Sequence, residues 1–126
     1  MSLRDPLARA RGLGSAKDGV AHWWLQRLSA VLLLPLSLWF FWAVAPLLRA
    51  DYPDARTYFA QPLAAFLLIA FLLAAIYHAL LGLQVVIEDY VHGRALEVGL
   101  QLLVKLAAFM LALAVVYSLI RITLGA

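Results

Sequence analysis

Three long stretches of the sequence carry almost no charge, and the polar residues gather between them. Residues 28–48 and 57–87 contain no charged side chain, and residues 98–120 contain only Lys105. About 20 helical residues cross the roughly 30 Å hydrocarbon core of a bilayer. Each stretch is long enough to do so. The pattern predicts an all-α integral membrane protein with three transmembrane helices, at about residues 25–48, 62–87 and 96–122.

The composition supports a membrane protein and argues against a soluble bundle. Of 126 residues, 66% are hydrophobic and 13% are charged, whereas soluble domains average about 45–50% apolar and about 25% charged residues. A soluble globule of this size has too little interior to enclose three such helices. We therefore expect one transmembrane anchor domain, residues 22–126, preceded by a polar, irregular arm, residues 1–21.

Local signals predict the ends and bends of these helices. Trp23 and Trp24 are typical of the aromatic belt at a membrane boundary. Pro35 predicts a bend in the first helix. The Asp-Tyr-Pro-Asp sequence at residues 51–54 predicts a turn, and residues 88–94 predict the loop between the second and third helices.

The distribution of basic residues predicts the orientation in the membrane. The first 27 residues contain five basic side chains, Arg4, Arg9, Arg11, Lys17 and Arg27. The positive-inside rule then places the N-terminus and the second loop in the cytoplasm, and the first loop and the C-terminus in the periplasm. We expect a multi-pass membrane protein. The basic residues do not cluster on a helix face with aromatics, so the net charge of +3 does not indicate nucleic-acid binding.

The chain contains no cysteine. This excludes disulfides, cysteine-ligated iron–sulfur clusters and covalently attached c-type haem within the chain. It leaves a non-covalently bound b-type haem possible.

His78 is the most informative single residue. It lies ten residues before Glu88, or roughly 15 Å along the helix from the membrane boundary. This depth is near the bilayer midplane, where a polar group is costly and needs a partner. His78 could hydrogen-bond to another helix, relay protons, or ligate a metal or haem iron. Position alone does not decide between these roles.

Small and polar residues share the helix face of His78. Gly82, Val85 and Asp89 follow at helical spacing, and Ala74 and Ala75 precede it. Such a face leaves room for a flat ligand. It is equally typical of transmembrane helices that pack closely.

Three further residues near the cytoplasmic boundary could carry chemistry. Tyr90 is either a belt residue or a hydrogen-bond donor to a quinone carbonyl, and Asp89 beside it could modulate proton delivery. Arg27 is either a topology-determining residue or a partner for an anionic group such as a haem propionate.

Two segments resemble the small hydrophobic anchor subunit of bacterial succinate dehydrogenase (complex II). One is the pattern His-x3-Gly-x6-Asp-Tyr-Val at residues 78–91, followed by Ala-Leu at 95–96 and Leu-Gln-Leu at 100–102. The other is Gly-Ser-Ala-Lys-x-Gly at residues 14–19, with His-Trp-Trp-x-Gln-Arg-x-Ser-Ala at 22–30. The resemblance covers nearly the whole chain, and these segments are its most specific parts.

The resemblance implies a role for each candidate residue. His78 would be an axial ligand of haem b iron. Tyr90 would hydrogen-bond ubiquinone, with Asp89 in the vicinity of that site. Arg27 would lie near the haem propionates and the quinone. It implies no role for His22 or for His92.

The resemblance also implies partners and a place in metabolism. The large cytochrome b anchor subunit would supply the second haem ligand, and an iron–sulfur subunit and a flavoprotein subunit would dock on the cytoplasmic face. Electrons from succinate oxidation in the tricarboxylic acid cycle would reach ubiquinone, and the chain itself would have no catalytic activity. The alternatives are a fumarate reductase-type anchor and a structural or assembly membrane protein without haem.

Overall fold

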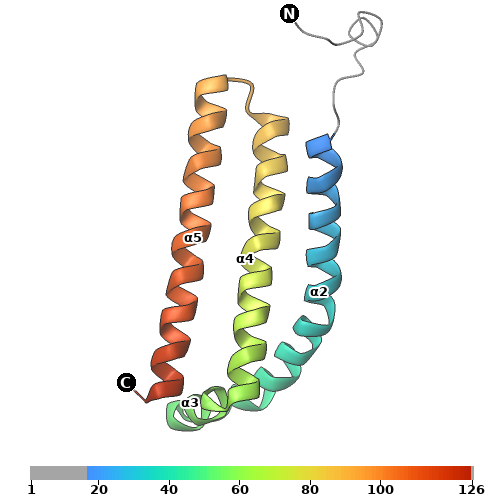
Figure 1. Ribbon diagram of the computed structural model, residues 1–126. Coiled ribbons are helices and arrows are strands. Elements are labelled where there is room, and N and C mark those ends of the chain that lie inside the picture. The colour runs from blue at the N-terminus through green and yellow to red at the C-terminus, as the bar shows by residue number, and fades with distance from the viewer. Residues whose placement is uncertain (1–16, 126) are drawn as a thin grey trace, which may run out of the picture.

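The computed structural model describes residues 17–125, and within that range it consists of helices. These are α2 (Lys17–Leu47), α3 (Tyr52–Ala60), α4 (Pro62–Tyr90) and α5 (Arg94–Leu124). The three long helices stand side by side with α4 in the middle, where it contacts both α2 and α5 (Figure 1). All three are long and apolar enough to cross a membrane, over 28, 29 and 31 residues. The predicted all-α class with three spans is confirmed.

The first helix begins earlier than the sequence predicted. Residues 17–21 were expected in the irregular arm, but they form the first five residues of α2. The rest of the expected arm, residues 1–16, lies outside the described residues. The division into arm and anchor, and the cytoplasmic and periplasmic placement of the two termini, stay predictions.

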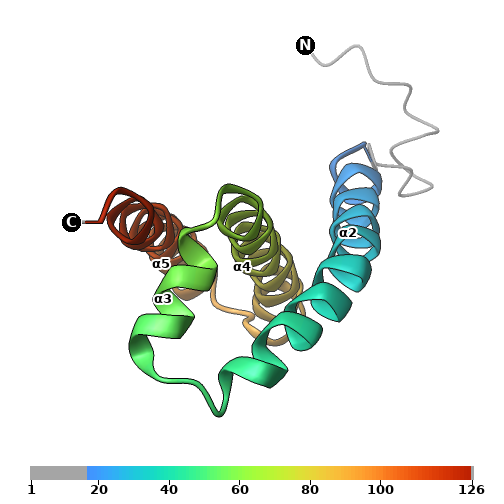
Figure 2. The same cartoon turned by 90° about the horizontal axis from the view of Figure 1, so that it is seen from below.

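The predicted turn at residues 51–54 is wrong, because these residues begin the short helix α3. Asp51 is extended (φ −75°, ψ 162°) and forms the N-cap, and Pro53 lies in the first turn. The Thr57 hydroxyl donates to the Pro53 carbonyl at 2.8 Å. Aspartate and proline favour both turns and helix starts. Here a helix follows, and it lies across the ends of α4 and α5 (Figure 2).

A single residue separates α3 from α4. Gln61 has extended backbone angles (φ −66°, ψ 134°) and is both the C-cap of α3 and the N-cap of α4. Proline disfavours helical angles in the residue before it and is well placed at the first position of a helix. Pro62 therefore ends α3 and starts α4. The sharp change of direction at Gln61 lays α3 across the ends of α4 and α5.

The loop between α4 and α5 is shorter than predicted. Helix α4 continues through Tyr90, so only Val91, His92 and Gly93 connect it to α5. Gly93 is the extended N-cap of α5, and Gly125, with φ +73°, forms the left-handed C-cap at its other end.

Helix α2 curves toward α3 in its second half (Figures 1 and 2). Pro35 and Pro46 both lie inside this helix, and each removes a backbone donor and crowds the preceding turn. A stacked pair of rings, Phe40 of α2 and Phe71 of α4, joins the curved half to the bundle with centroids 4.6 Å apart.

The chain buries little of its own apolar surface. Within residues 20–125 the buried apolar side chains are Leu36, Ala43, Ala64, Ala65, Leu81, Ile87 and Leu119. Most leucine and phenylalanine side chains are exposed. In a bilayer such a surface faces lipid tails or other membrane helices at no hydrophobic cost.

A polar contact joins α4 to α5 near the Tyr90 end. The Gln101 side-chain amide donates to the Gln84 carbonyl oxygen and to Glu88 Oε1, both at 3.3 Å. These hydrogen bonds fix the axial register of α4 and α5 close to the short loop that joins them.

Replacing Gln101 by glutamate should destabilise this helix pair. The change removes the donor and sets a second carboxylate against Glu88, at a cost of about 1 kcal/mol because the exposed Glu88 is screened by water. Thermal unfolding in detergent micelles measures the effect. The double variant Gln101→Glu/Glu88→Gln restores a donor and an acceptor between positions 88 and 101 but not the bond to the Gln84 carbonyl, and should recover part of the loss. Equal melting temperatures of the wild type and Gln101→Glu would show that these hydrogen bonds do not stabilise the helix pair.

Candidate functional site

The imidazole of His78 joins α4 to α2 through both ring nitrogens. His78 Nδ1 lies 2.9 Å from Ser29 Oγ, and His78 Nε2 lies 3.4 Å from Gln26 Nε2. Ser29 is buried. The histidine is therefore held across the seam between α2 and α4; its depth in a bilayer stays a prediction.

The proton arrangement follows from Ser29. Its hydroxyl donates to the Gln26 backbone carbonyl at 2.9 Å, and a hydroxyl has only one hydrogen to donate. Ser29 therefore accepts a hydrogen bond from His78 Nδ1–H. In the neutral imidazole the other nitrogen, Nε2, then carries the lone pair. The Gln26 amide nitrogen donates toward that lone pair.

The residues of α2 that face His78 form a polar stripe. His22, Gln26 and Ser29 follow at spacings of four and three, which places them on one face of the helix. Gly82 of α4 lies opposite this stripe, since a Cβ built on it would meet Gln26 Nε2 at 3.6 Å. The glycine leaves space beside α4 for the end of the Gln26 side chain.

Two atoms of the stripe are buried without a hydrogen-bond partner among the described residues. These are His22 Nε2 and Gln26 Oε1. Unsatisfied polar atoms in a low-dielectric seam are costly. The seam between α2 and α4 thus offers hydrogen-bonding capacity that the described part of the chain does not use itself.

Arg27 points away from this seam. It follows Gln26 and is therefore about 100° further around the helix. Its guanidinium lies 4.4 Å from the centre of the Trp23 ring, a cation–π contact, and the residue is exposed. The structure does not bring Arg27 to His78. It is left free to meet a group outside the chain.

Tyr90 and Asp89 lie at the C-terminal end of α4. Both are exposed, Tyr90 by 79%. They are about 18 Å along the helix from His78, so this chain does not bring the Asp-Tyr pair into contact with the imidazole. The pair lies at the same end of the bundle as the N-terminal part of α2, which contains Arg27 (Figure 1).

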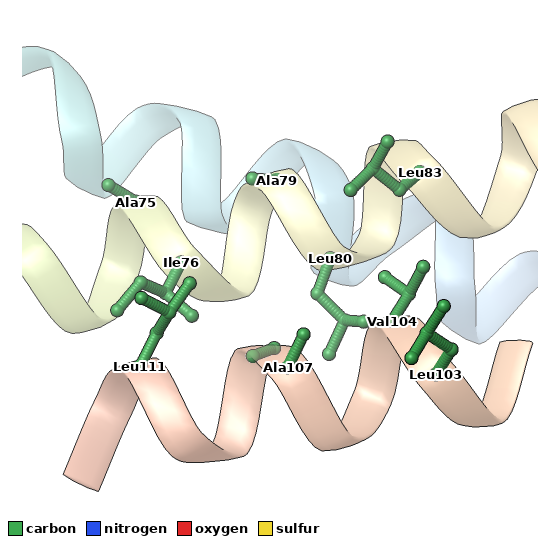
Figure 3. A pocket seen from close by; sticks show the side chains of 10 residues that line it. Ala75, Ile76, Ala79, Leu80, Leu83, Leu103, Val104, Ala107 and Leu111 are labelled. Carbon is green, nitrogen blue, oxygen red and sulfur yellow. The ribbon is translucent and has the colours of Figure 1, made fainter. Parts of the chain in front are cut away.

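A different face of α4 forms an apolar groove with α5, shown in Figure 3. It measures about 500 Å³, and its lining residues are Ala75, Ile76, Ala79, Leu80, Leu83, Leu103, Val104, Ala107, Ala108 and Leu111. Of the small residues expected beside His78, Gly82 faces α2, whereas Ala75 lines this groove. The groove contains no group that could bind iron or move a proton.

Within residues 17–125 no three histidine, cysteine, aspartate or glutamate side chains cluster so as to hold a metal ion. A metal ion at His78 would take its remaining ligands from another molecule.

The sequence analysis found His78 and Gly82 but did not predict their partners. Gln26 and Ser29 occur there only as part of the motif at residues 22–30. Their spacing with His22 carries the missing signal, because three polar residues on one face of an apolar helix must face protein and not lipid.

The fold and the seam define a class: a multi-pass membrane protein with a histidine, His78, held between two of its long helices. Comparison with known proteins narrows this class. The family model of the succinate dehydrogenase/fumarate reductase transmembrane subunit matches residues 1–120. The chain belongs to this family, and the prediction of a membrane anchor subunit without catalytic activity of its own is confirmed.

Individual relatives agree with the family. A succinate dehydrogenase hydrophobic membrane anchor subunit from Rickettsia bellii is 33% identical over 116 residues, which is 92% of this chain and 93% of the relative. The protein of the same description from Paracoccus denitrificans is 32% identical over 126 residues, 100% of this chain and 97% of the relative. No solved structure gives a significant match to the chain.

The close approach at Gly82 can be tested by substitution. Gly82→Ala should be tolerated, because its Cβ would make an ordinary 3.6 Å contact with Gln26. Gly82→Leu should force α2 away from α4 and lower the thermal stability by several degrees, since the larger side chain has no room in the seam. Gly99, which has open space around its Cβ position, is the matched control. Equal melting of Gly82→Leu and Gly99→Leu in micelles would contradict the close seam.

Proposed function

We propose that the chain is the membrane anchor subunit of succinate dehydrogenase in a bacterial inner membrane. In this role it supplies one axial ligand, His78, to haem b and part of the site at which ubiquinone is reduced. Its partners are the large cytochrome b anchor subunit, the iron–sulfur subunit, the flavoprotein subunit and membrane lipid. The haem, the quinone and these partner assignments go beyond family membership.

The hydrogen bond between Ser29 and His78 carries the proposal. A haem-ligating histidine binds iron through one nitrogen, and a hydrogen bond from the other fixes the tautomer and the ring orientation. Ser29 accepts from Nδ1–H at 2.9 Å, so Nε2 keeps the lone pair that an iron ion requires.

The residues around His78 fit the group. Gln26 is the one side chain in front of Nε2, at the long distance of 3.4 Å, and its Oε1 has no partner among the described residues. A small rotation of Gln26 would uncover Nε2. The iron, when bound, takes up and releases single electrons. His78 holds it, Ser29 orients His78, and the apolar residues of the seam exclude water.

The Tyr90 end supports a quinone site. Ubiquinone reduction consumes protons at its carbonyl oxygens. Tyr90 has a phenol that can donate to such an oxygen, and Asp89 is a carboxylate open to solvent that can pass protons toward it. Arg27, at the same end of the bundle, can meet a propionate or a quinone oxygen. Tyr90 is too exposed within one chain to form a site alone, so a second anchor subunit must cover it.

Succinate oxidation is the favoured direction, because the relatives compared above are described as succinate dehydrogenase subunits. The family model also covers fumarate reductase. Neither direction changes the role assigned to His78 or Tyr90.

Replacing His78 by alanine should abolish the b-type haem. The dithionite-reduced absorption spectrum of the purified complex is expected to lose its b-type band, because the variant lacks the proposed iron ligand. His92→Ala, which changes an exposed loop histidine, should leave the band unchanged. A b-type band of full intensity in the His78→Ala complex would contradict the assignment of His78 as an iron ligand.

Ser29→Ala separates ligation from packing. If Ser29 orients a ligating imidazole, the band should remain while the midpoint potential of the haem shifts, since the ligand loses its outer hydrogen bond. A purely packing role would instead lower stability with no change in any redox potential.

Tyr90→Phe should slow quinone reduction by about 10- to 100-fold, because the variant loses the donor to the quinone oxygen. Succinate oxidation with an artificial acceptor should be unchanged, as it does not need the quinone site. Tyr58→Phe, on α3 at the opposite end of the bundle, is the control. Loss of both activities in Tyr90→Phe would point to an assembly role and against the proposed site.

A further inference from the structure

The α3 end of the bundle has a polar hollow that the proposed function does not use. Helix α3 contacts both α4 and α5 and lies across their ends (Figure 2). The hollow between α3 and the last turns of α5 measures about 460 Å³. Its lining residues are Tyr52, Arg56, Tyr117, Ser118, Arg121, Ile122 and Gly125.

The two helices contribute the same pair of residues. Helix α3 presents Tyr52 and Arg56, and helix α5 presents Tyr117 and Arg121. In both pairs the spacing is four, so each tyrosine and its arginine lie on one helix face. Two guanidinium groups and three hydroxyls, including Ser118, therefore surround one hollow. All of these groups can donate hydrogen bonds.

The charges of the hollow are unbalanced. Among the described residues, two arginines line it and no carboxylate does. Asp51 and Asp54 are at the same end of the helix bundle, but they do not line the hollow. Two like charges around one hollow repel each other, and an anion between them would remove this cost. Planar guanidinium groups match the paired oxygens of a phosphate particularly well.

The position of the hollow identifies the source of the phosphate. Arg121 lies in the last turn of a 31-residue apolar helix, and such a turn reaches the headgroup layer of a bilayer. Tyr52 and Tyr117 are 76% and 63% exposed, as is typical of aromatic residues at the membrane interface. A neighbouring hollow shares Arg56, Ile122 and Gly125 with this one and is also lined by Thr57, Ala60, Thr123 and Leu124.

We infer that this hollow binds the headgroup phosphate of an anionic membrane phospholipid. Arg56 and Arg121 hold the phosphate oxygens, and the tyrosine and serine hydroxyls donate to the remaining oxygens. The lipid ties α3 to α5. The inference is independent of haem or quinone binding at the other end of the bundle.

The test compares lipid retention by variants of the full-length chain in its purified complex. Phosphatidylglycerol is added in detergent, with zwitterionic phosphatidylcholine as the comparison lipid, and bound lipid is counted by native mass spectrometry. The double variant Arg56→Gln/Arg121→Gln should bind phosphatidylglycerol about tenfold more weakly. Arg49→Gln removes a charge between α2 and α3 outside the hollow and should change binding by less than about twofold. Equal retention by the wild type and the double variant would overturn the inference.

Two further measurements use the wild-type protein and so do not depend on folding of the variants. Phosphatidylglycerol with a photoactivatable headgroup should label residues 52–56 and 117–125. Labelling confined to other segments would overturn the site. Inorganic phosphate at millimolar concentration should fail to release the lipid. Its release by phosphate would show that the hollow binds a free anion, and would overturn the lipid assignment.

Discussion

A polar side chain inside a bilayer must find its hydrogen-bond partners within protein, and this constraint determines how α2 and α4 pair. The imidazole of His78 cannot reach water from the depth it occupies. Ser29 and Gln26 meet its two nitrogens, and Gly82 leaves space beside α4 for the Gln26 amide. A rotation of either helix by one residue would place the imidazole or the serine in lipid. The polar seam thus fixes the rotation of both helices more sharply than the apolar contacts, which slide at little cost.

The same contacts determine what the histidine can do. Because the Ser29 hydroxyl is committed to the Gln26 carbonyl, the imidazole proton is held at Nδ1. The fold therefore presents Nε2 as a base or ligand, in a seam that excludes bulk water. The hydrogen bond from His78 to Ser29 that holds α2 and α4 together is also the one that leaves the Nε2 lone pair available. This is why a structural and a ligating role are not exclusive here, and why only a spectrum or a redox potential can separate them.

The sequence predicts the three spans because charge-free runs of more than 20 residues have few other solutions. It predicts the depth of His78 for the same reason, since helical rise converts residue number into distance. It fails at residues 51–54, where aspartate and proline signal a helix start as readily as a turn, and the packing of α3 on α4 and α5 decides. It also fails to place Arg27, because one residue of helical rotation separates the seam from the Trp23 side. Rotational positions depend on neighbouring helices, which local sequence does not encode.

What the chain lacks is as instructive as what it contains. Its long helices expose most of their apolar side chains, Tyr90 lies open at one end, and two buried atoms of the α2 stripe have no partner among the described residues. A lipid tail can cover the apolar faces but cannot satisfy His22 Nε2 or Gln26 Oε1. Those atoms require a polar group between or beside α2 and α4. A cofactor or a second anchor subunit at the seam would meet this requirement, and either one would complete a site of which this chain forms one wall.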